Sequence, residues 1–358
     1  MKHHHTTDHP VFCPACSRRS LLTGAAALAL TTTAARAQVS PPDNYGAPDH
    51  SKTDHLVDVH FHVGSPMLAA LQGKRGGRPG SNPSAETLLG VLDEGGVQIG
   101  VCSSIIPTDV TNVQSEITAA SRDANEWMAK LRHDHPTRFG ILASLPLPDI
   151  DATLKEIAYA FDTLKADGVH MPTYVGGHWF GEPWFAPVLD ELNRRKAIIK
   201  THPALPDSVK MKDFAFVGTG IVELGTDTMR SMQAFLFSGM ANKYKDVKVI
   251  WSHAGGAFLG QAQRFVNAAD SGKFKAQLPD GPMAELKRHY YDIAQALHPA
   301  TQRELKNFVP NSQILFGTDY PFWTPKRTID AIRVADVFSE SDIAGWGSNA
   351  KKLFALKA

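Results

Sequence analysis

Histidine and aspartate side chains stand at the ends of strand-like stretches that are far apart in the sequence. The first stretch carries His60 and His62, and both imidazoles point the same way because side chains two residues apart on a strand share a face. Later stretches end at His202, His253 and Asp319. Together these imidazoles and this carboxylate would suit Zn²⁺ or a similar divalent ion and leave a coordination position for water or substrate.

Each of these residues also has a plainer explanation. A His-x-His pair is commonly a surface feature or a hydrogen-bonded part of the core. His202 precedes Pro203 and could simply end a strand, and Asp319 could be a turn residue. The metal site is favoured because all of these residues coincide with strand ends. His170, near the end of the fourth stretch, is expected to pack or to bond to a neighbour rather than to act in the site.

Strand-like and helix-like stretches alternate from residue 56 to the end of the chain. The expected strands are 56–62, 98–104, 140–145, 168–171, 197–202, 247–253, 290–294 and 313–319. The expected helices are 116–132, 152–166, 183–195, 228–244, 257–268, 299–307, 327–337 and 340–354. This alternation predicts an α/β fold, a (β/α)8 TIM barrel, in which the loops after the strands build the mouth of the site. An open doubly wound sheet is disfavoured because no Gly-x-Gly-x-x-Gly follows the first strand.

The chain begins with a segment typical of an export signal. Residues 1–37 contain Arg18 and Arg19 beside a short apolar run, and they end at Ala37 in the Ala-x-Ala pattern that signal peptidases cleave. The paired arginines indicate a twin-arginine signal, which exports folded proteins, and predict a periplasmic protein. A Sec signal and an amphipathic N-terminal helix that stays attached are the alternatives.

The rest of the chain divides into a leader and a barrel domain. Residues 38–54 are rich in Pro, Ser, Asp and Gly without an apolar period, which predicts a flexible leader. Residues 55–358 form the expected barrel. Within it, the stretch 72–83 is polar and glycine-rich, and we expect a loop near the barrel mouth.

The composition argues against nucleic acid and membrane as partners of the mature protein. Lys plus Arg (37) and Asp plus Glu (36) nearly cancel over 358 residues, so the chain has no basic field for a phosphate backbone and nucleic acid is not an expected partner. No apolar stretch reaches the roughly 18 residues that a membrane-spanning helix needs. We therefore expect no membrane segment in the mature protein.

Four stretches of the barrel domain resemble the amidohydrolase superfamily, and specifically its decarboxylase branch. They read DVHFH, GEPWFAPVLDELNRRKAIIKTHP, VKVIWSHAGG and ILFGTDYPF, and they occur in order and at family-like separations. The branch (amidohydrolase-related family 2) includes aminocarboxymuconate-semialdehyde and 6-methylsalicylate decarboxylases. The resemblance covers nearly all of residues 55–356 and implies a TIM barrel of the metal-dependent hydrolase type.

The resemblance implies metal ligands at His60, His62, His202 and Asp319, with His253 beside the substrate or the water at the metal. Two-metal members of the superfamily carry a bridging carboxylated lysine on the fourth strand. The fourth strand here has no lysine at its end, which implies one divalent ion. Zn²⁺ is the expected ion, with Mn²⁺ as the alternative.

Arg264 follows His253 and matches an arginine that reaches a substrate carboxylate in related enzymes, sometimes across a dimer interface. Through this match the resemblance implies substrate binding at Arg264 and allows a homodimer. A solvated charge on a helix face is the other explanation for this residue.

The implied activity is metal-dependent non-oxidative decarboxylation of a small aromatic or unsaturated carboxylic acid. Asp319 or His253 would deliver the proton that replaces CO₂ on carbon, and the sequence leaves both open. The alternative is metal-dependent hydrolysis of an amide, lactone or C–C bond, because the same ion would activate water. A catalytically silent binding barrel is a third hypothesis. The expected export differs from the usual cytoplasmic location of these decarboxylases and leaves the substrate open.

Overall fold

The computed structural model describes residues 55–73, 83–106, 111–206 and 220–356. The chain divides into Met1–Tyr45 and Gly46–Ala358, and all described residues belong to the second unit. The predicted export signal, 1–37, and the predicted leader, 38–54, lie outside the described residues.

Eight parallel strands form one sheet in the order β1-β2-β3-β4-β7-β8-β9-β10. A separate antiparallel hairpin, β5 with β6, follows β4. The strands are β1 (Leu56–His62), β2 (Val97–Ser103), β3 (Phe139–Ser144), β4 (Gly168–Pro172), β5 (Tyr174–Val175), β6 (His178–Trp179), β7 (Ile198–His202), β8 (Lys248–Trp251), β9 (Tyr290–Asp292) and β10 (Ile314–Leu315).

The sheet closes on itself because the chain after β10 runs beside β1. The amide of Val59 donates to the carbonyl of Phe316 at 3.0 Å, and the amide of His62 donates to the carbonyl of Tyr320 at 3.0 Å. Each strand is thereby paired on both sides, as in a barrel without free edges. The predicted (β/α)8 TIM barrel is confirmed.

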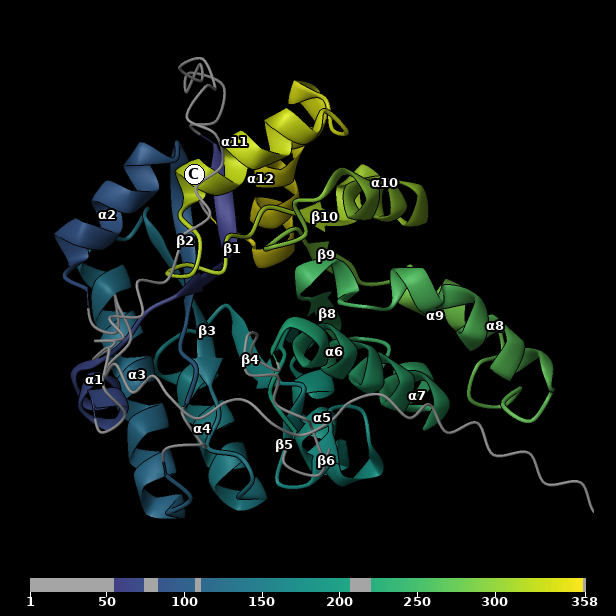
Figure 1. Cartoon of the computed structure of the whole chain (residues 1–358). Helices are drawn as coiled ribbons and strands as arrows, with labels where there is room; N and C mark the ends of the chain where they lie inside the picture. Colours follow the sequence, from purple (N-terminus) through teal and green to yellow (C-terminus); the bar gives the residue numbers. More distant parts are fainter. Residues whose placement is uncertain (1–54, 74–82, 107–110, 207–219, 357–358) are drawn as a thin grey trace, which may run out of the picture. The chain divides into compact units, whose positions relative to one another are not determined.

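Helices surround the strands (Figure 1). They are α1 (Pro66–Gly73), α2 (Ala85–Glu94), α3 (Gln114–Asp134), α4 (Ile150–Asp162), α5 (Ala186–Arg194), α6 (Gly220–Phe237), α7 (Met240–Lys243), α8 (Ala262–Asp270), α9 (Pro282–Leu286), α10 (Pro299–Phe308), α11 (Pro325–Ala335) and α12 (Glu340–Phe354). Among the helices of the described ranges, none is both long and apolar enough to span a lipid bilayer.

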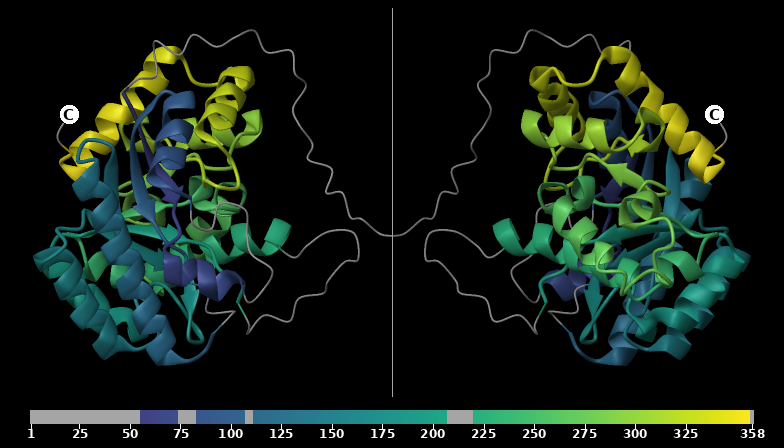
Figure 2. Two further views of the ribbon diagram at one scale, coloured as in Figure 1. Left: turned by 90° about the vertical axis from the view of Figure 1, so that its left-hand side faces the viewer. Right: turned by 90° about the vertical axis from the view of Figure 1, so that its right-hand side faces the viewer.

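The last helix packs across the first strand, next to the point where the barrel closes (Figure 2). α12 begins at a capping box in which the Ser339 hydroxyl accepts from the Asp342 amide and the Asp342 carboxylate accepts from the Ser339 amide. Gly347 lets the two backbones approach closely, since a Cβ there would lie 2.0 Å from the carbonyl oxygen of His55.

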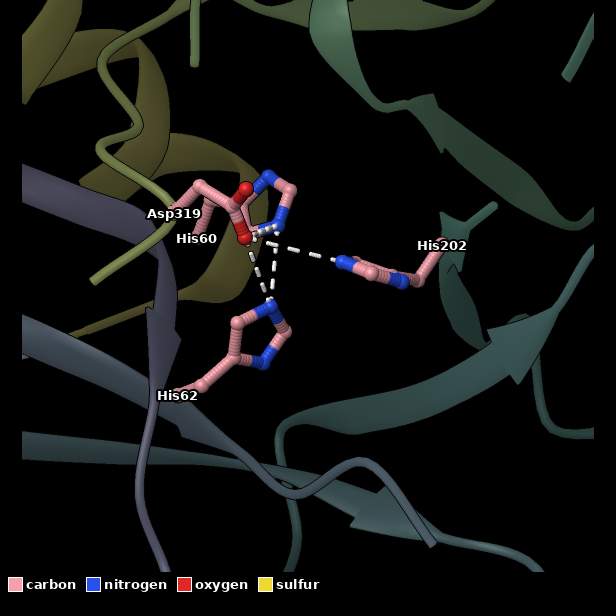
Figure 3. Close-up of side chains that lie close together, drawn as sticks. All are labelled: His60, His62, His202 and Asp319. Carbon is pink, nitrogen blue, oxygen red and sulfur yellow. Dashed lines mark hydrogen bonds and ion pairs between the residues drawn. The ribbon is translucent and has the colours of Figure 1, made fainter. Parts of the chain in front are cut away.

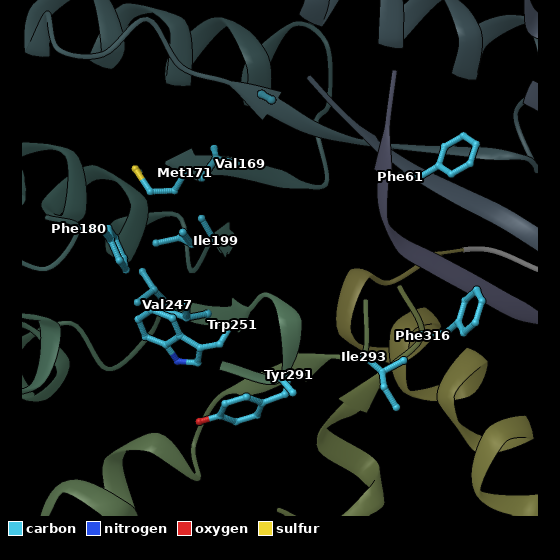
Figure 4. Packing of buried hydrophobic residues seen from close by; sticks show 14 of the residues in the cluster. Phe61, Val169, Met171, Phe180, Ile199, Val247, Trp251, Tyr291, Ile293 and Phe316 are labelled. Carbon is cyan, nitrogen blue, oxygen red and sulfur yellow. The ribbon is translucent and has the colours of Figure 1, made fainter. Parts of the chain in front are cut away.

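The two faces of β1 show why polar residues gather inside the barrel. Along β1 all seven side chains are buried, but the two faces differ in chemistry. One face is apolar and packs into the hydrophobic clusters between strands and helices; it carries Val57, Val59 and Phe61. Figure 4 shows the corresponding packing around Trp251, Tyr291 and Phe316. The other face of β1 points into the barrel and is polar; it carries Asp58, His60 and His62.

Several sequence predictions need correction. The single helix expected over 228–244 is divided into α6 and α7, because Gly239 adopts a left-handed φ of 86° between them. The loop expected over 72–83 begins later, since α1 extends to Gly73, and 74–82 lie outside the described residues. The strand expected over 313–319 is regular only at β10, although its continuation pairs with β1. Helices α1, α2 and α9 and the β5–β6 hairpin were not expected from the sequence.

Candidate metal centre

Four side chains converge at the carboxyl ends of the barrel strands (Figure 3). His60 and His62 come from β1, His202 ends β7, and Asp319 lies in the segment after β10. Their ligand atoms all lie within 4.8 Å of one another. Asp319 Oδ1 is 3.1 Å from His60 Nε2, 3.0 Å from His62 Nε2 and 3.5 Å from His202 Nε2. The structure therefore brings together the four residues that the sequence proposed as ligands.

Hydrogen bonds on the outer side of the rings fix the tautomers. His60 Nδ1 donates to Asp292 Oδ2 at 3.0 Å, and His202 Nδ1 donates to the carbonyl of Pro203 at 2.9 Å. A carboxylate and a carbonyl only accept, so Nδ1 carries the proton in both rings. When the ring is neutral, each Nε2 then presents a lone pair to the centre, the arrangement found in metal-binding histidines.

His62 completes this pattern through a hydroxyl. Its Nδ1 lies 3.0 Å from Ser103 Oγ, which can accept a hydrogen bond from that nitrogen, and its Nε2 lies 3.1 Å from His60 Nε2. Two imidazole nitrogens that face each other at this distance need either a proton on one of them or a metal cation between them. Ligands of a tetrahedral ion with bonds of about 2.0–2.1 Å are about 3.3 Å apart, which matches the spacing here. The residues present therefore fit one divalent ion.

The protonation states also suit a metal. Burial lowers the pKa of His202 to about 3 and holds the pKa of His62 well below its usual range. Burial alone would raise the pKa of the Asp319 carboxyl, but the charge on His60 and hydrogen bonds from the neighbouring rings hold it well below its usual range. His62, His202 and Asp319 therefore need to lose no proton when a metal binds. Burial and Lys200 would lower the pKa of His60, but the carboxylates of Asp292 and Asp319 raise it, so His60 is the ligand that gives up a proton to the metal.

Asp292, at the end of β9, is a residue that the sequence analysis missed. One oxygen of its carboxylate accepts from His60 Nδ1, and the other accepts from the backbone amide of His253 at 3.0 Å. Burial would raise its pKa, but His60 and Lys200 hold that pKa at about 2. This ionised carboxylate orients a predicted ligand and the backbone of a predicted catalytic residue together. Its signal in the sequence was a carboxylate in the middle of the seventh expected strand, 290–294.

Asp58 was missed as well, although it belongs to the DVHFH stretch. Its carboxylate accepts from Thr318 Oγ1 at 2.6 Å, from the Thr318 amide at 3.2 Å and from the His60 amide at 3.0 Å. These bonds join β1 to the residue before Asp319. Burial raises the pKa of Asp58 to about 7. Asp58 thus positions the two segments that carry three of the four candidate ligands.

The second oxygen of Asp319 faces a different group of side chains. Oδ2 accepts from Gln295 Nε2, and His253 Nε2 lies 3.5 Å from it. All three residues have left-handed backbone, with φ of 64° at Asp319, 53° at Gln295 and 54° at His253. Such φ values are uncommon outside glycine and cluster at functional sites. The His253 ring stacks on the His60 ring with centroids 5.0 Å apart. No motif or spacing in the sequence singles out Gln295.

Lys200 and His170 lie next to the ligand set inside the barrel. Lys200 is fully buried on β7, two residues before His202, and its Nζ has no hydrogen-bond partner among the residues that the structure describes. Burial lowers its pKa to about 8. His170 donates from Nδ1 to the Ser104 carbonyl at 3.1 Å, as its expected bond to a neighbour requires, yet its ring lies 5.8 Å from that of His62. Lys200 was not singled out from the sequence.

Arg264 is not brought to the cluster. It lies on the exposed side of α8, next to buried Phe265. Within the described ranges it forms no hydrogen bond or ion pair with the four candidate ligands. Its predicted contact with a substrate carboxylate stays a prediction.

Comparison with known proteins identifies the family. The family model described as "Amidohydrolase" matches residues 57–356, which is most of the chain and all of the barrel strands except the first residue of β1. The chain belongs to the amidohydrolase family. Among curated relatives of this amidohydrolase, decarboxylase yanB of Aspergillus niger is 30% identical over 301 residues, covering 79% of this chain and 82% of the relative.

A second relative is the 6-methylsalicylic acid decarboxylase of Penicillium expansum. It is 29% identical over 274 residues, covering 74% of this chain and 84% of the relative. Among solved structures, the barrel of this amidohydrolase resembles a dihydroxybenzoic acid decarboxylase from Polaromonas sp. JS666 that contains manganese and the inhibitor 2-nitroresorcinol. That match has a TM-score of 0.73 at 19% identity and covers 85% of this chain and 98% of the other, so it shows a shared fold.

Proposed function

We propose that this amidohydrolase is a metal-dependent non-oxidative decarboxylase, a carboxy-lyase that acts on a small aromatic or unsaturated carboxylic acid. The observation that carries the proposal is the convergence of three imidazole Nε2 atoms and Asp319 Oδ1 at the barrel mouth with a further histidine, His253, beside them. The curated relatives named as decarboxylases support the same reaction class.

The residues of the site have different roles in the proposed reaction. When bound, a divalent ion at the four-residue site supplies positive charge that orients the substrate carboxylate and stabilises the negative charge left on carbon as CO₂ departs. His60, His62, His202 and Asp319 hold that charge in place. His60, His62 and Asp319 are buried, which strengthens electrostatic interactions relative to water.

His253 is the better candidate for the proton that replaces CO₂. Burial would raise the pKa of Asp319, but the charge on His60 and the hydrogen bonds from the neighbouring rings together hold it well below its usual range, so this carboxyl stays ionised and is a poor donor. His253 Nε2 lies beside Asp319 Oδ2, and Asp292 fixes the His253 backbone. We assign proton delivery to His253 and ligand binding to Asp319.

The choice of ion belongs to the proposal. Three imidazoles and one carboxylate are a ligand set that suits Zn²⁺, and Mn²⁺ is the alternative because manganese is bound in the solved dihydroxybenzoic acid decarboxylase. Export is a further part of the proposal. Arg18 and Arg19, followed by the Ala-x-Ala pattern that ends at Ala37, support a twin-arginine route to the periplasm.

The test is a product analysis on metal-loaded protein. Salicylate-type acids and unsaturated acids are incubated with protein loaded with Zn²⁺ or Mn²⁺, and released CO₂ is measured. Simple amides and lactones are assayed in parallel for hydrolytic acid release. The proposal predicts CO₂ from at least one acid and no hydrolysis. Acid release from an amide or lactone without CO₂ from any acid would support the hydrolase instead.

A further inference from the structure

Asp227 is a buried carboxylate that the proposed mechanism does not use. It lies on α6 with no exposed surface, and donors from three other segments meet it. Its Oδ1 accepts from the indole nitrogen of Trp179 on β6 at 2.7 Å. Its Oδ2 accepts from the Thr173 hydroxyl and from the backbone amide of Ala204 at 3.0 Å. An indole and an amide only donate, so both oxygens of Asp227 serve as acceptors.

The peptide group between Pro203 and Ala204 connects this carboxylate to the candidate metal centre. Its N–H donates to Asp227 Oδ2, and its C=O, the carbonyl of Pro203, accepts from His202 Nδ1 at 2.9 Å. A peptide group is planar and rigid, so a contact that fixes the N–H also fixes the direction of the C=O. That carbonyl in turn orients the His202 ring, whose Nε2 lies 3.5 Å from Asp319 Oδ1.

A second path from α6 holds the backbone of the same ligand. The amide of Thr173 donates to the carbonyl of His202 at 2.9 Å. The hydroxyl of Thr173 donates to Asp227 and lies 3.2 Å from the Ala204 amide, and its carbonyl accepts from the Ser231 hydroxyl at 2.7 Å. Because Asp227 and Ser231 both lie on α6, one helix fixes the main chain and the side chain of His202.

The contact at His202 differs from the contact at His60. Behind His60 stands the carboxylate of Asp292, whereas behind His202 stands a neutral carbonyl. A hydrogen bond from the N–H of a peptide group to a carboxylate polarises that group and makes its carbonyl oxygen a stronger acceptor. Asp227 can therefore supply to His202, through one peptide group, part of what a direct carboxylate partner supplies to a histidine ligand.

We propose that Asp227 is a positioning residue for the metal centre. Through the peptide group between Pro203 and Ala204 it fixes the ring of His202, strengthens the hydrogen bond from Nδ1 and raises the affinity of the site for its metal. Asp227 itself is no ligand and has no contact with the four-residue site. This role rests on the metal centre of the proposed function and is independent of the reaction catalysed there.

The test measures the affinity of metal-free protein for Zn²⁺ by competition with a chelator, at a temperature at which every variant is folded. Asp227→Leu replaces the carboxylate with an apolar side chain of similar size and should weaken Zn²⁺ binding roughly 10-fold, the lower end of the cost of a lost partner behind a histidine ligand. Asp227→Asn removes the same charge but keeps an oxygen for the Ala204 amide, because Trp179, which is only partly buried, can turn away from the new NH₂ group. Its affinity should fall by only about 3-fold.

The matched control is Asp167→Leu, at the amino end of β4 and therefore at the opposite end of the barrel. The Asp167 side chain is 16% exposed and accepts from the Ile141 amide at 2.7 Å and from Arg132 at 3.2 Å. Asp167→Leu should lower the thermal stability of the metal-free protein and keep the wild-type affinity for Zn²⁺. The same result for Asp227→Leu would make its role merely structural and would overturn the proposal.

Proton exchange at His202 is the second measurement. In Zn²⁺-loaded protein, NMR follows the Nδ1 proton, which should exchange with water roughly 10-fold faster in Asp227→Leu and by an intermediate factor in Asp227→Asn. Equal losses of affinity in the two Asp227 variants would mean that charge alone matters, which overturns the proposal. An Asp227→Asn protein that matches wild type in affinity and in proton exchange overturns it too, even if Asp227→Leu does not fold.

The outcomes also separate the role of Asp227 from the proposed function. Affinities in the predicted order, in a protein that releases CO₂ from no acid, keep the role of Asp227 and contradict decarboxylation. Decarboxylation in a protein whose affinity for Zn²⁺ is unchanged in both Asp227 variants keeps the function and overturns the role of Asp227. Wild-type protein that binds no divalent ion overturns both.

Discussion

The carboxylate of Asp292 accepts a hydrogen bond from His60 Nδ1 at 3.0 Å, and it joins the candidate metal centre to the candidate proton donor. Its other oxygen accepts from the backbone amide of His253 at 3.0 Å. One buried carboxylate therefore sets the tautomer of a ligand and the position of the residue that acts next to it. Histidine ligands commonly depend on such a partner.

Asp292→Asn should weaken metal binding by roughly 10- to 100-fold, the usual cost of losing a carboxylate partner behind a histidine ligand. The amide can present a donor to His60 Nδ1, which disturbs the tautomer that frees Nε2. The carbonyl oxygen of the amide can still accept from the His253 backbone, so turnover should fall in step with the loss of metal. The loss of metal affinity is measured by titrating metal into the metal-free protein. Asp280→Asn, at an exposed loop position, is the matched control, and equal affinities in the two variants would contradict the role of Asp292.

Mutations of the candidate ligands and of the candidate proton donor should have different effects on metal content and turnover. His60→Ala and Asp319→Ala should abolish metal binding and activity together, since each removes one of four ligand atoms from one centre. His253→Asn should keep about one ion per chain and lower turnover roughly 100-fold, the scale of a lost acid–base group. Elemental analysis of the metal content, together with a rate measurement, distinguishes a metal ligand from an acid–base residue. If His253→Asn loses its metal as His60→Ala does, His253 is a ligand.

The buried ammonium of Lys200 should oppose cation binding. Burial lowers its pKa, while the carboxylates of Asp292, Asp319 and Asp58 favour its charged form. Replacing it by methionine removes a positive charge near the ion and leaves the carboxylates without compensation in the metal-free protein. Lys200→Met should therefore gain more thermal stability from added Zn²⁺ than wild type, with an affinity increase of about 10-fold or about 1.4 kcal/mol.

Thermal unfolding with and without metal measures this gain. Lys130→Met, on α3, where the ammonium side chain is 63% exposed, is the control and should respond as wild type does. A smaller gain in Lys200→Met than in wild type would contradict the electrostatic role and indicate that Lys200 supports the centre.

His289, which is not part of the candidate metal centre, should make the free energy of unfolding depend on pH. The amide of Val249 donates to His289 Nδ1 at 3.3 Å, and burial lowers the pKa of His289 to about 3. The His289 side chain takes up a proton near pH 6.5 in the unfolded chain but only near pH 3 in the folded chain. Its contribution to the free energy of unfolding is therefore complete above pH 6.5 and is lost as the pH falls toward 3. The slope from this group is about 1.4 kcal/mol per pH unit.

Denaturant unfolding between pH 7 and pH 4 tests this slope. His289→Gln removes the titrating group while keeping an acceptor, so its stability should fall less steeply with pH than that of wild type. His133→Gln, at a side chain that is 88% exposed, should keep the wild-type slope. Parallel pH profiles for wild type and His289→Gln would count against a neutral, buried His289.

The parts of the molecule that local pattern determines could be predicted. The helix expected over 340–354 coincides with α12, because Ser339 caps it and buried residues recur every three or four positions. The candidate ligands were found because their residue types coincide with strand ends, and a barrel collects strand ends at one mouth. The helix over 228–244 was predicted as continuous because nothing in the apolar period reports the left-handed backbone at Gly239.

The residues that position the ligands could not be predicted, because their partners are distant in the sequence. Asp58 and Thr318 are 260 positions apart, and only closure of the barrel places one against the other. The role of Asp292 depends in the same way on His60, 232 positions away. Lys200 lies two residues before His202 on β7 and shares its face by alternation, but its pairing with His170 depends on the register of β4 against β7, which alternation does not determine.

The most direct measurement of the central claim is the CO₂ released by metal-free protein as Zn²⁺ or Mn²⁺ is titrated in. The substrate would be the acid that the product analysis finds, with salicylate-type acids tried first. We predict that CO₂ release rises with added metal and saturates at about one ion per chain, and that Asp319→Ala shows no rise. Hydrolysis of an amide or lactone with no CO₂ from any acid, or CO₂ release that does not depend on metal, would contradict the account.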